Sequence, residues 1–289
     1  MPSLVRIKPP GGESYVSIKR ALRSNGLATV CEEAHCPNID ECWSSGTATI
    51  MLMGGICTRG CRFCSVGSGK PLSLDLQEPI KVASVLKEWG LKYVVLTSVC
   101  RDDVPDGGAS HFMETIRMAK RENPGLLVEA LIPDFSANEG SLKIMADSGA
   151  DVISHNIETV ERLTGKVRDA RAGYRQSLFV LKRIKEMSPR AYTKSSIMVG
   201  LGETDDEIEK AMDDLRKASV DFLTIGQYLR PTRRNLGVEE HITFEKFSEY
   251  KEIGERKGFL YVASGPMVRS SYKAGEFFIE SLVKSKANV

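Results

Sequence analysis

Short apolar runs alternate with amphipathic stretches along most of the chain. In two of these stretches, 174–187 and 204–218, apolar side chains recur at steps of three and four residues and so share one helical face. Strands that alternate with helices pair in parallel, because each helical crossover returns the chain to the same end of the sheet. The pattern therefore predicts parallel strands in the apolar runs 47–53, 92–98, 126–132, 151–156, 194–200, 222–228 and 259–264.

Polar and glycine-rich segments follow most of these predicted strands. They read "CTRGCRFC", "TSVCRDD", "HNIET", "GLGET", "QYLRPTRRN" and "SGPMVRSSY". A barrel builds its site from many such loops at the carboxyl ends of its strands, whereas an open doubly wound sheet concentrates its site at one switch point. We predict an α/β fold, a partial (β/α)6-type TIM barrel over residues 47–264, with an N-terminal extension over 1–46 and a C-terminal segment over 265–289.

Composition limits the kinds of partner. With 40 Lys and Arg against 38 Asp and Glu, the net charge of +2 gives no general attraction to nucleic acid or to an anionic membrane. No apolar run is long enough to span a bilayer, and the N-terminus shows no secretory signal or extended amphipathic leader. We expect a soluble monomer without a nucleic-acid or membrane partner. The cytoplasm is the default compartment, and the mitochondrial matrix is the alternative if a leader has been trimmed.

The cysteines carry the clearest chemical signal. Six of the seven cysteines fall into two groups within 34 residues, which argues against a secreted disulfide framework and favours a reducing compartment. The second group, here called the loop cysteines, has the spacing C-x3-C-x2-C directly after the first predicted strand and consists of Cys57, Cys61 and Cys64. Three thiolates on one loop suit a cubane iron–sulfur cluster with one open iron better than a closed zinc site.

The loop cysteines, with Phe63 before the last of them, resemble the motif of the radical S-adenosylmethionine superfamily. The resemblance implies a [4Fe–4S] cluster whose open iron binds S-adenosylmethionine. It also implies that an electron from the cluster breaks the sulfonium bond and gives a 5′-deoxyadenosyl radical. A zinc or structural site is the alternative.

The first group, here called the extension cysteines, has the spacing C-x4-C-x5-C and consists of Cys31, Cys36 and Cys42. The residues alone leave half of a zinc site as an alternative, with His35 as a further ligand. Zinc sites usually pair their ligands more closely than this spacing does, and His35 directly adjoins Cys36. The spacing by itself leaves the group one ligand short of a closed site.

A longer resemblance connects the two groups. The segments "VCEEAHCPNIDECW", "CTRGCRFC", "VLTSVCRDDVPDGGASHF", "HNIETVERL", "YTKSSIMVGLGET", "QYLRPTRRNLGVEE" and "GPMVRSSYKAGE" resemble the lipoyl synthase family in order, over most of residues 11–278. The resemblance implies a second, auxiliary [4Fe–4S] cluster on the extension cysteines, with Ser270 as its fourth ligand. It also implies that this cluster donates the inserted sulfur. On the residues alone, Ser270 reads as a turn or cap serine.

The reaction implied is insertion of two sulfur atoms at C6 and C8 of a protein-bound octanoyl-lysine. These carbons are saturated, so neither acid–base nor nucleophilic catalysis has a group to act on, and a radical is required. The implied partners are octanoylated lipoyl-carrier domains (a 2-oxoacid dehydrogenase E2 or the glycine cleavage H protein), an electron donor such as ferredoxin or flavodoxin, and a carrier that repairs the consumed cluster. The rivals are an enzyme resembling biotin synthase and a non-catalytic cluster or zinc protein.

The resemblance also predicts the residues that contact S-adenosylmethionine. The alternative for Thr97 and Ser98 is that they are ordinary hydroxyl residues at a strand end. The alternative for Lys194 and Ser195 is that their side chains face solvent. Gly200 belongs to a lone G-x-G, which is a weak signal of close backbone approach. The predicted contacts are Phe63, Thr97, Ser98, Asn156, Glu158, Lys194, Ser195, Gly200 and Arg230.

One position departs from the family pattern. The family usually reads "TSVDRDD", whereas this chain has Cys100 in place of the first aspartate. An isolated cysteine at a strand end is more often a small buried residue than a ligand. Any role of the aspartate's charge therefore does not carry over to this chain.

Overall fold

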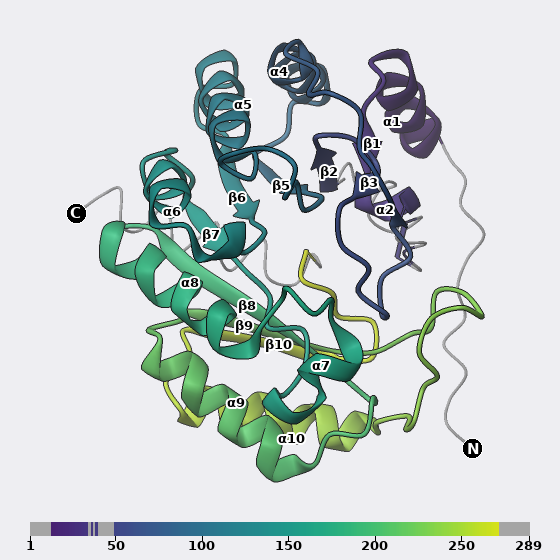
Figure 1. Cartoon of the computed structure of the whole chain (residues 1–289), viewed down its shortest axis with the longest axis vertical. Helices are drawn as coiled ribbons and strands as arrows, with labels where there is room; N and C mark the ends of the chain where they lie inside the picture. The colour runs from purple at the N-terminus through teal and green to yellow at the C-terminus, as the bar shows by residue number, and fades with distance from the viewer. Residues whose placement is uncertain (1–12, 34–35, 37, 40–48, 272–289) are drawn as a thin grey trace.

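A computed structural model describes residues 13–33, 36, 38–39 and 49–271, and eight of its strands form one curved sheet with helices on the outer side (Figure 1). Strand β1 is antiparallel to β2, and every other neighbouring pair in the sheet is parallel. Within the described residues the edge strands β1 and β10 do not pair, so the barrel is partial. In spatial order the strands are β1 (Ala28–Thr29), β2 (Thr49–Leu52), β5 (Tyr93–Ser98), β6 (Leu127–Leu131), β7 (Val152–Ser154), β8 (Tyr192–Val199), β9 (Phe222–Gln227) and β10 (Tyr261–Gly265).

The predicted fold class is confirmed. Each of the seven predicted apolar runs overlaps one parallel strand, and the two periodic stretches form α8 (Tyr174–Met187) and α9 (Asp205–Lys217). Helix α9 begins with a capping box, in which Thr204 and Glu207 each bond the other's backbone N–H. The N-terminal extension adds something that the pattern did not predict, because its two-residue strand β1 joins the edge of the sheet beside β2.

The remaining helices lie between the strands in sequence. Helices α4, α5 and α6 cover one part of the sheet, and α8, α9 and α10 cover the other (Figure 1). No helix in the described ranges combines the length and the apolar character needed to cross a membrane. The bounds are α1 (Glu13–Ser24), α2 (Val30–Glu33), α4 (Glu78–Trp89), α5 (Ala109–Glu122), η1 (Phe135–Ala137), α6 (Glu139–Ala146), η2 (Glu161–Leu163), α7 (Thr164–Val167) and α10 (Phe244–Arg256), with two short strands, β3 (Ile56–Cys57) and β4 (Gly67–Ser68).

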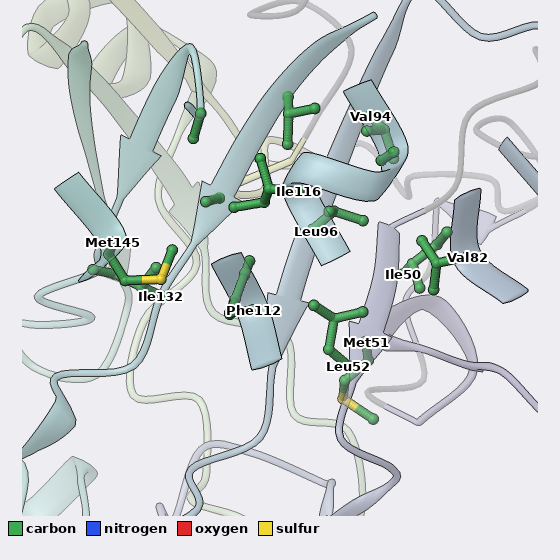
Figure 2. Packing of buried hydrophobic residues seen from close by; sticks show 14 of the residues in the cluster. Ile50, Met51, Leu52, Val82, Val94, Leu96, Phe112, Ile116, Ile132 and Met145 are labelled. Carbon is green, nitrogen blue, oxygen red and sulfur yellow. The ribbon is translucent and has the colours of Figure 1, made fainter. Parts of the chain in front are cut away.

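Apolar side chains fill the space between the strands and the helices. Figure 2 shows this packing where strands β2 and β5 meet α4 and α5, with Leu52, Leu96, Val82 and Phe112 all fully buried. A separate cluster fills the inside of the barrel and includes Tyr93, Val95, Val152, Tyr192 and Phe222. Most of these inner residues begin their strands, so the amino end of the barrel is closed and a ligand has room only at the carboxyl end.

Candidate active site

A cavity of about 570 Å³ lies at the carboxyl ends of the strands. Its wall includes all three loop cysteines together with Cys31 and Cys36 of the extension. Ser270 and its neighbour Ser271 complete the wall from the C-terminal side. Cys42 lies outside the described residues. The structure therefore brings the described members of both cysteine groups, and the predicted serine ligand, to one chamber.

Hydrogen bonds fix the backbone between the first two loop cysteines. The Thr58 N–H donates to the carbonyl of Cys100 at 3.1 Å, and the Thr58 hydroxyl donates to the same carbonyl at 3.0 Å. The Gly60 N–H donates to Asp169 Oδ2 at 2.8 Å. These partners come from the loops after β5 and before α8, so two other parts of the barrel hold the cysteine loop in place.

Arg59 anchors the same loop through buried ion pairs. Its guanidinium lies 2.7 Å from Asp102 Oδ1 and 2.6 Å from Asp134 Oδ2, and its side chain is only 2% exposed. The hydrogen bond from Arg59 lowers the pKa of Asp102. Arg171 adds a bond to the Thr58 carbonyl at 2.8 Å. Because a planar guanidinium can bond two carboxylates at once, Arg59 ties the cysteine loop to the loops after β5 and β6.

The Cys57 sulfur sits among hydrogen-bond donors. It accepts the backbone N–H groups of Arg59 and Cys100, each at 3.4 Å. A hydrogen bond from the Cys100 thiol, followed by these N–H bonds and the Arg59 charge, lowers the pKa of Cys57 to about 6 against the opposing effect of burial. Donors of this kind favour the thiolate, which is the form that binds iron. Cys100 thus lies beside a predicted cluster ligand, where its backbone and its thiol both contribute.

At the other two loop cysteines, burial has the largest effect on the pKa of the thiol. It raises the pKa of Cys61 and raises that of Cys64 to about 12, while the Asp169 N–H donates to the Cys61 sulfur at 3.3 Å. In the described part of the chain, no three His, Cys, Asp or Glu side chains converge on a single-ion site. The donor set fits a cubane cluster, because each thiolate of a cubane bonds to its own iron and iron takes the place of the proton.

The extension and the C-terminal segment meet beside the cavity. The Asn38 side-chain amide donates to the carbonyl of Met267 at 2.8 Å. Gly226 lets the C-terminal segment lie close against β9, since a Cβ there would lie 2.1 Å from the Val268 carbonyl oxygen. Asn38 Oδ1 and Arg269 Nη2 are buried and have no hydrogen-bond partner in the described residues. Orphaned polar atoms beside Cys36 and Ser270 fit a group that would bind between these two segments.

Six of the nine predicted S-adenosylmethionine contacts line the cavity, and these are Phe63, Thr97, Ser98, Asn156, Glu158 and Arg230. The Ser98 hydroxyl is buried without a partner among the described residues, whereas Thr97 donates to the Leu131 carbonyl at 2.9 Å. Burial raises the pKa of Glu158, and its carboxylate accepts one hydrogen bond among the described residues, from the Asn156 amide at 3.1 Å. The Arg230 guanidinium bonds carbonyls of its own loop, including that of Asn235 at 2.9 Å, so it braces the loop.

Lys194, Ser195 and Gly200 do not lie in the cavity wall. Lys194 forms a buried ion pair with Glu129 at 2.9 Å inside the barrel, and Ser195 Oγ accepts the Ile157 N–H at 3.3 Å. Gly200 has φ +98°, and a Cβ there would lie 2.2 Å from Gln227 Nε2, so the close approach is to its own neighbours. The structure therefore does not bring these three residues to the cavity wall, and their contact with S-adenosylmethionine stays a prediction.

Sequence reasoning missed several polar residues of the cavity wall, among them His155, Arg168 and Ser196. Ser196 follows the two residues predicted on β8 and is the one that reaches the cavity. His155 stands beside Asn156 in the "HNIET" segment, which was a usable signal. Arg168 lies after α7 in a segment with no motif, so nothing in the sequence pointed to it.

Comparison with known proteins identifies the class. Residues 51–215 match the family model described as the Radical SAM superfamily, and this span contains the loop cysteines and most of the barrel. Together with the cavity, this match defines a radical S-adenosylmethionine enzyme.

Curated relatives identify the family. Over 99% of its length the chain is 57% identical to "Lipoyl synthase, mitochondrial" of Culex quinquefasciatus, covering 77% of that protein. It is 55% identical to the protein of the same name from Drosophila melanogaster, of which it covers 78%. The chain belongs to the lipoyl synthase family and is a sulfur-inserting radical enzyme.

Solved structures support the fold. The FeFe-hydrogenase maturase of Carboxydothermus hydrogenoformans is similar with a TM-score of 0.60 at 13% identity, over 92% of this chain and 78% of that one. Methylornithine synthase is similar with a TM-score of 0.55, also at 13% identity, over 91% of this chain and 82% of that one. At such low identity the likeness concerns the fold alone.

Proposed function

We propose that the chain uses two [4Fe–4S] clusters to insert sulfur at C6 and C8 of an octanoyl group carried on a protein lysine. The loop cysteines would hold the first cluster. The extension cysteines and Ser270 would hold the auxiliary cluster, which donates the sulfur. The observation that carries this proposal is the shared cavity of about 570 Å³, whose wall includes the loop cysteines, Cys31, Cys36 and Ser270.

When bound, the first cluster and S-adenosylmethionine supply a carbon-centred radical that can abstract hydrogen from a saturated carbon. The residues of the chain bind, orient and exclude water. Arg59 with its two aspartates holds the cysteine loop, and apolar side chains of the cavity wall, such as Met51, Ile132 and Met198, suit an uncharged acyl chain. An amide-linked octanoyl group enters such a wall more easily than a free carboxylate does, because a buried charge needs a partner.

The three parts of the chain take different roles in this proposal. Residues 1–46 supply the auxiliary-cluster cysteines, 47–264 form the radical barrel, and 265–289 supply Ser270. Arg233 and Arg234 are both exposed on the loop after β9, and we assign them to the docking of an acidic carrier domain through salt-sensitive contacts.

The remaining partners follow from the reaction. They are an octanoylated E2 or H-protein lipoyl domain, a ferredoxin or flavodoxin as electron donor, and a cluster-repair carrier, with the enzyme acting as a monomer and without nucleic acid or membrane. Relatives at 55–57% identity are named as mitochondrial proteins, which supports the mitochondrial matrix and gives no support to the cytoplasmic default.

The test is an anaerobic reaction of the reconstituted protein with an octanoyl-lysine peptide, S-adenosylmethionine and a reductant, followed by mass spectrometry. We expect a product that has gained two sulfurs, from protein that contains about eight irons. Abundant zinc without iron, or cleavage of S-adenosylmethionine without sulfur transfer, would refute the two-cluster proposal.

A further inference from the structure

Cys100 contacts Cys57, the first of the loop cysteines, through both its side chain and its backbone. Its thiol donates a hydrogen bond to the Cys57 sulfur, and its backbone N–H donates to the same sulfur at 3.4 Å. Both side chains are partly buried, both are free thiols, and both line the cavity. The cavity wall therefore holds two free thiols in direct contact, within reach of a small molecule.

The backbone beside these two thiols has the spacing that a disulfide needs. The Thr58 N–H donates to the Cys100 carbonyl at 3.1 Å, so the chain just after Cys57 pairs with the chain at Cys100. Backbones joined by such a bond lie about 5 Å apart. A disulfide links residues whose Cα atoms are about 4.4–6.8 Å apart. Small rotations of the two side chains would therefore bring the sulfur atoms to bonding distance.

The other two loop cysteines have backbone donors instead. The Cys61 sulfur accepts the Asp169 N–H at 3.3 Å, and the Cys64 sulfur accepts the Val66 N–H. Cys57 also accepts backbone N–H groups, but the hydrogen bond with the largest effect on it comes from a second thiol. Among the loop cysteines, this contact between two sulfurs singles out Cys57 for reaction with Cys100.

We propose that Cys57 and Cys100 form a reversible disulfide before a cluster binds, with a small disulfide of the glutathione class as the oxidant. One protein sulfur attacks the small disulfide and releases one thiol. The other protein sulfur then attacks the mixed disulfide and releases the second thiol. Two protein thiols are oxidised, the small disulfide is reduced, and both protons leave with the released thiols. Excess thiol reverses the exchange.

The disulfide would protect a cluster ligand during assembly. A free thiolate can be oxidised to sulfinic and sulfonic acids, which thiols do not reduce, whereas a disulfide returns to two thiols. Disulfides in reducing compartments are usually transient in this way. The consequence for iron rests on the proposed function, since Cys57 must be reduced to bind a cluster. The family pattern has aspartate in place of Cys100, so the protection is specific to chains with cysteine there.

The experiment maps the disulfide by mass spectrometry. Metal-free, reduced protein is treated anaerobically with oxidised glutathione, its remaining thiols are blocked with N-ethylmaleimide, and it is digested without reduction. Trypsin releases Cys100 as the only cysteine of peptide 93–101. Cleavage by trypsin after Arg59 and by chymotrypsin after Trp43 separates Cys57 from every other cysteine. The partner of Cys100 can therefore be read from the masses of the linked peptides.

The Cys100 peptide should be joined mainly to the Cys57 peptide. In urea, where the seven cysteines pair without the fold, this product should be at least about threefold less abundant, because the fold supplies the effective concentration. Cys100→Asp is the control variant, and it should leave Cys57 as a mixed disulfide with glutathione. The proposal would be overturned if Cys100 of the native protein still reacted with maleimide or joined another cysteine.

Protein reconstituted with iron and sulfide separates this proposal from the proposed function. With a cluster on the loop cysteines, iron holds the Cys57 sulfur, and the same treatment should leave Cys100 reduced. If the disulfide formed equally well in the reconstituted protein, the ligand role of Cys57 would fail. If it formed in neither preparation, the disulfide would be refuted and the ligand role would stand.

Discussion

Replacing Lys194 tests whether that residue is structural, as its position indicates, or contacts the cosubstrate, as the sequence suggested. Its ammonium lies 3.0 and 2.9 Å from the two carboxylate oxygens of Glu129. The same carboxylate accepts the hydroxyls of Tyr93 at 2.7 Å and Ser154 at 2.9 Å. The Lys194 and Glu129 side chains are 4% and 1% exposed. Lys194→Met therefore leaves a buried carboxylate with two neutral donors and no counter-charge.

The expected cost follows from this geometry. Removing one partner of a buried, hydrogen-bonded ion pair typically costs about 3–5 kcal/mol, because the other charge stays buried. That is a large part of the roughly 5–15 kcal/mol by which domains are stable. Lys194→Met combined with Glu129→Gln removes both charges. The decrease in the free energy of unfolding of the double variant should therefore be smaller, by at least about 2 kcal/mol, than the sum of the decreases in the two single variants.

The assay is urea unfolding of the metal-free protein under reducing, anaerobic conditions, followed by circular dichroism. The exposed pair of Lys210 with Asp214, 2.9 Å apart, supplies a control, and Lys210→Met should cost less than about 1 kcal/mol. The structural role would be refuted if the free energy of unfolding of Lys194→Met lay within about 1 kcal/mol of the wild-type value. If it also failed to bind S-adenosylmethionine, the ligand-contact role would be restored.

Three further predictions concern the clusters and the substrate. Replacing all three loop cysteines by alanine should leave roughly half of the iron and abolish S-adenosylmethionine cleavage, whereas replacing the extension cysteines should spare some cleavage and stop sulfur insertion; identical behaviour in iron and cleavage assays would contradict the division of labour. Ser270→Ala should destabilise the auxiliary cluster in absorption spectra more than Ser271→Ala does, and the reverse order would move the ligand by one residue. In competition kinetics an octanoyl-lysine peptide should be preferred to free octanoate, because its amide carries no charge to bury; equal turnover of both would count against a protein-bound substrate.

The secondary structure was largely predictable because the spacing of apolar residues along the chain indicates which residues are buried. All six residues of β5 and of β9 are buried or nearly so, and such continuous apolar runs are typical of strands covered on both faces. Helix α8 was predictable to its ends from the spacing of its buried face. Strand β1 was not, since two residues are too few to show any period.

The same double burial explains why the predicted and the observed residues of the cavity wall differ on β8. Seven of the eight residues of β8 are buried, so the sequence cannot tell which side chains face the barrel interior and which face the cavity. Lys194 was therefore predicted at the cavity, whereas Ser196, which was not predicted, is the one of these two residues in its wall. The partners of Arg59 and Arg168 were also beyond prediction, because they come from other loops and from helix α8, which only the fold brings together.

The bond from Asn38 to Met267 joins positions 229 residues apart. At the usual rate of synthesis, on the order of tens of seconds pass between the emergence of these two residues from a ribosome. During that interval the cysteines near Asn38 have no C-terminal segment to cover them, and their thiols are open to oxidation and to stray metals. On the proposed role of Ser270, metallation of the auxiliary site has to wait for release of the finished chain, which makes assembly a late, post-translational step.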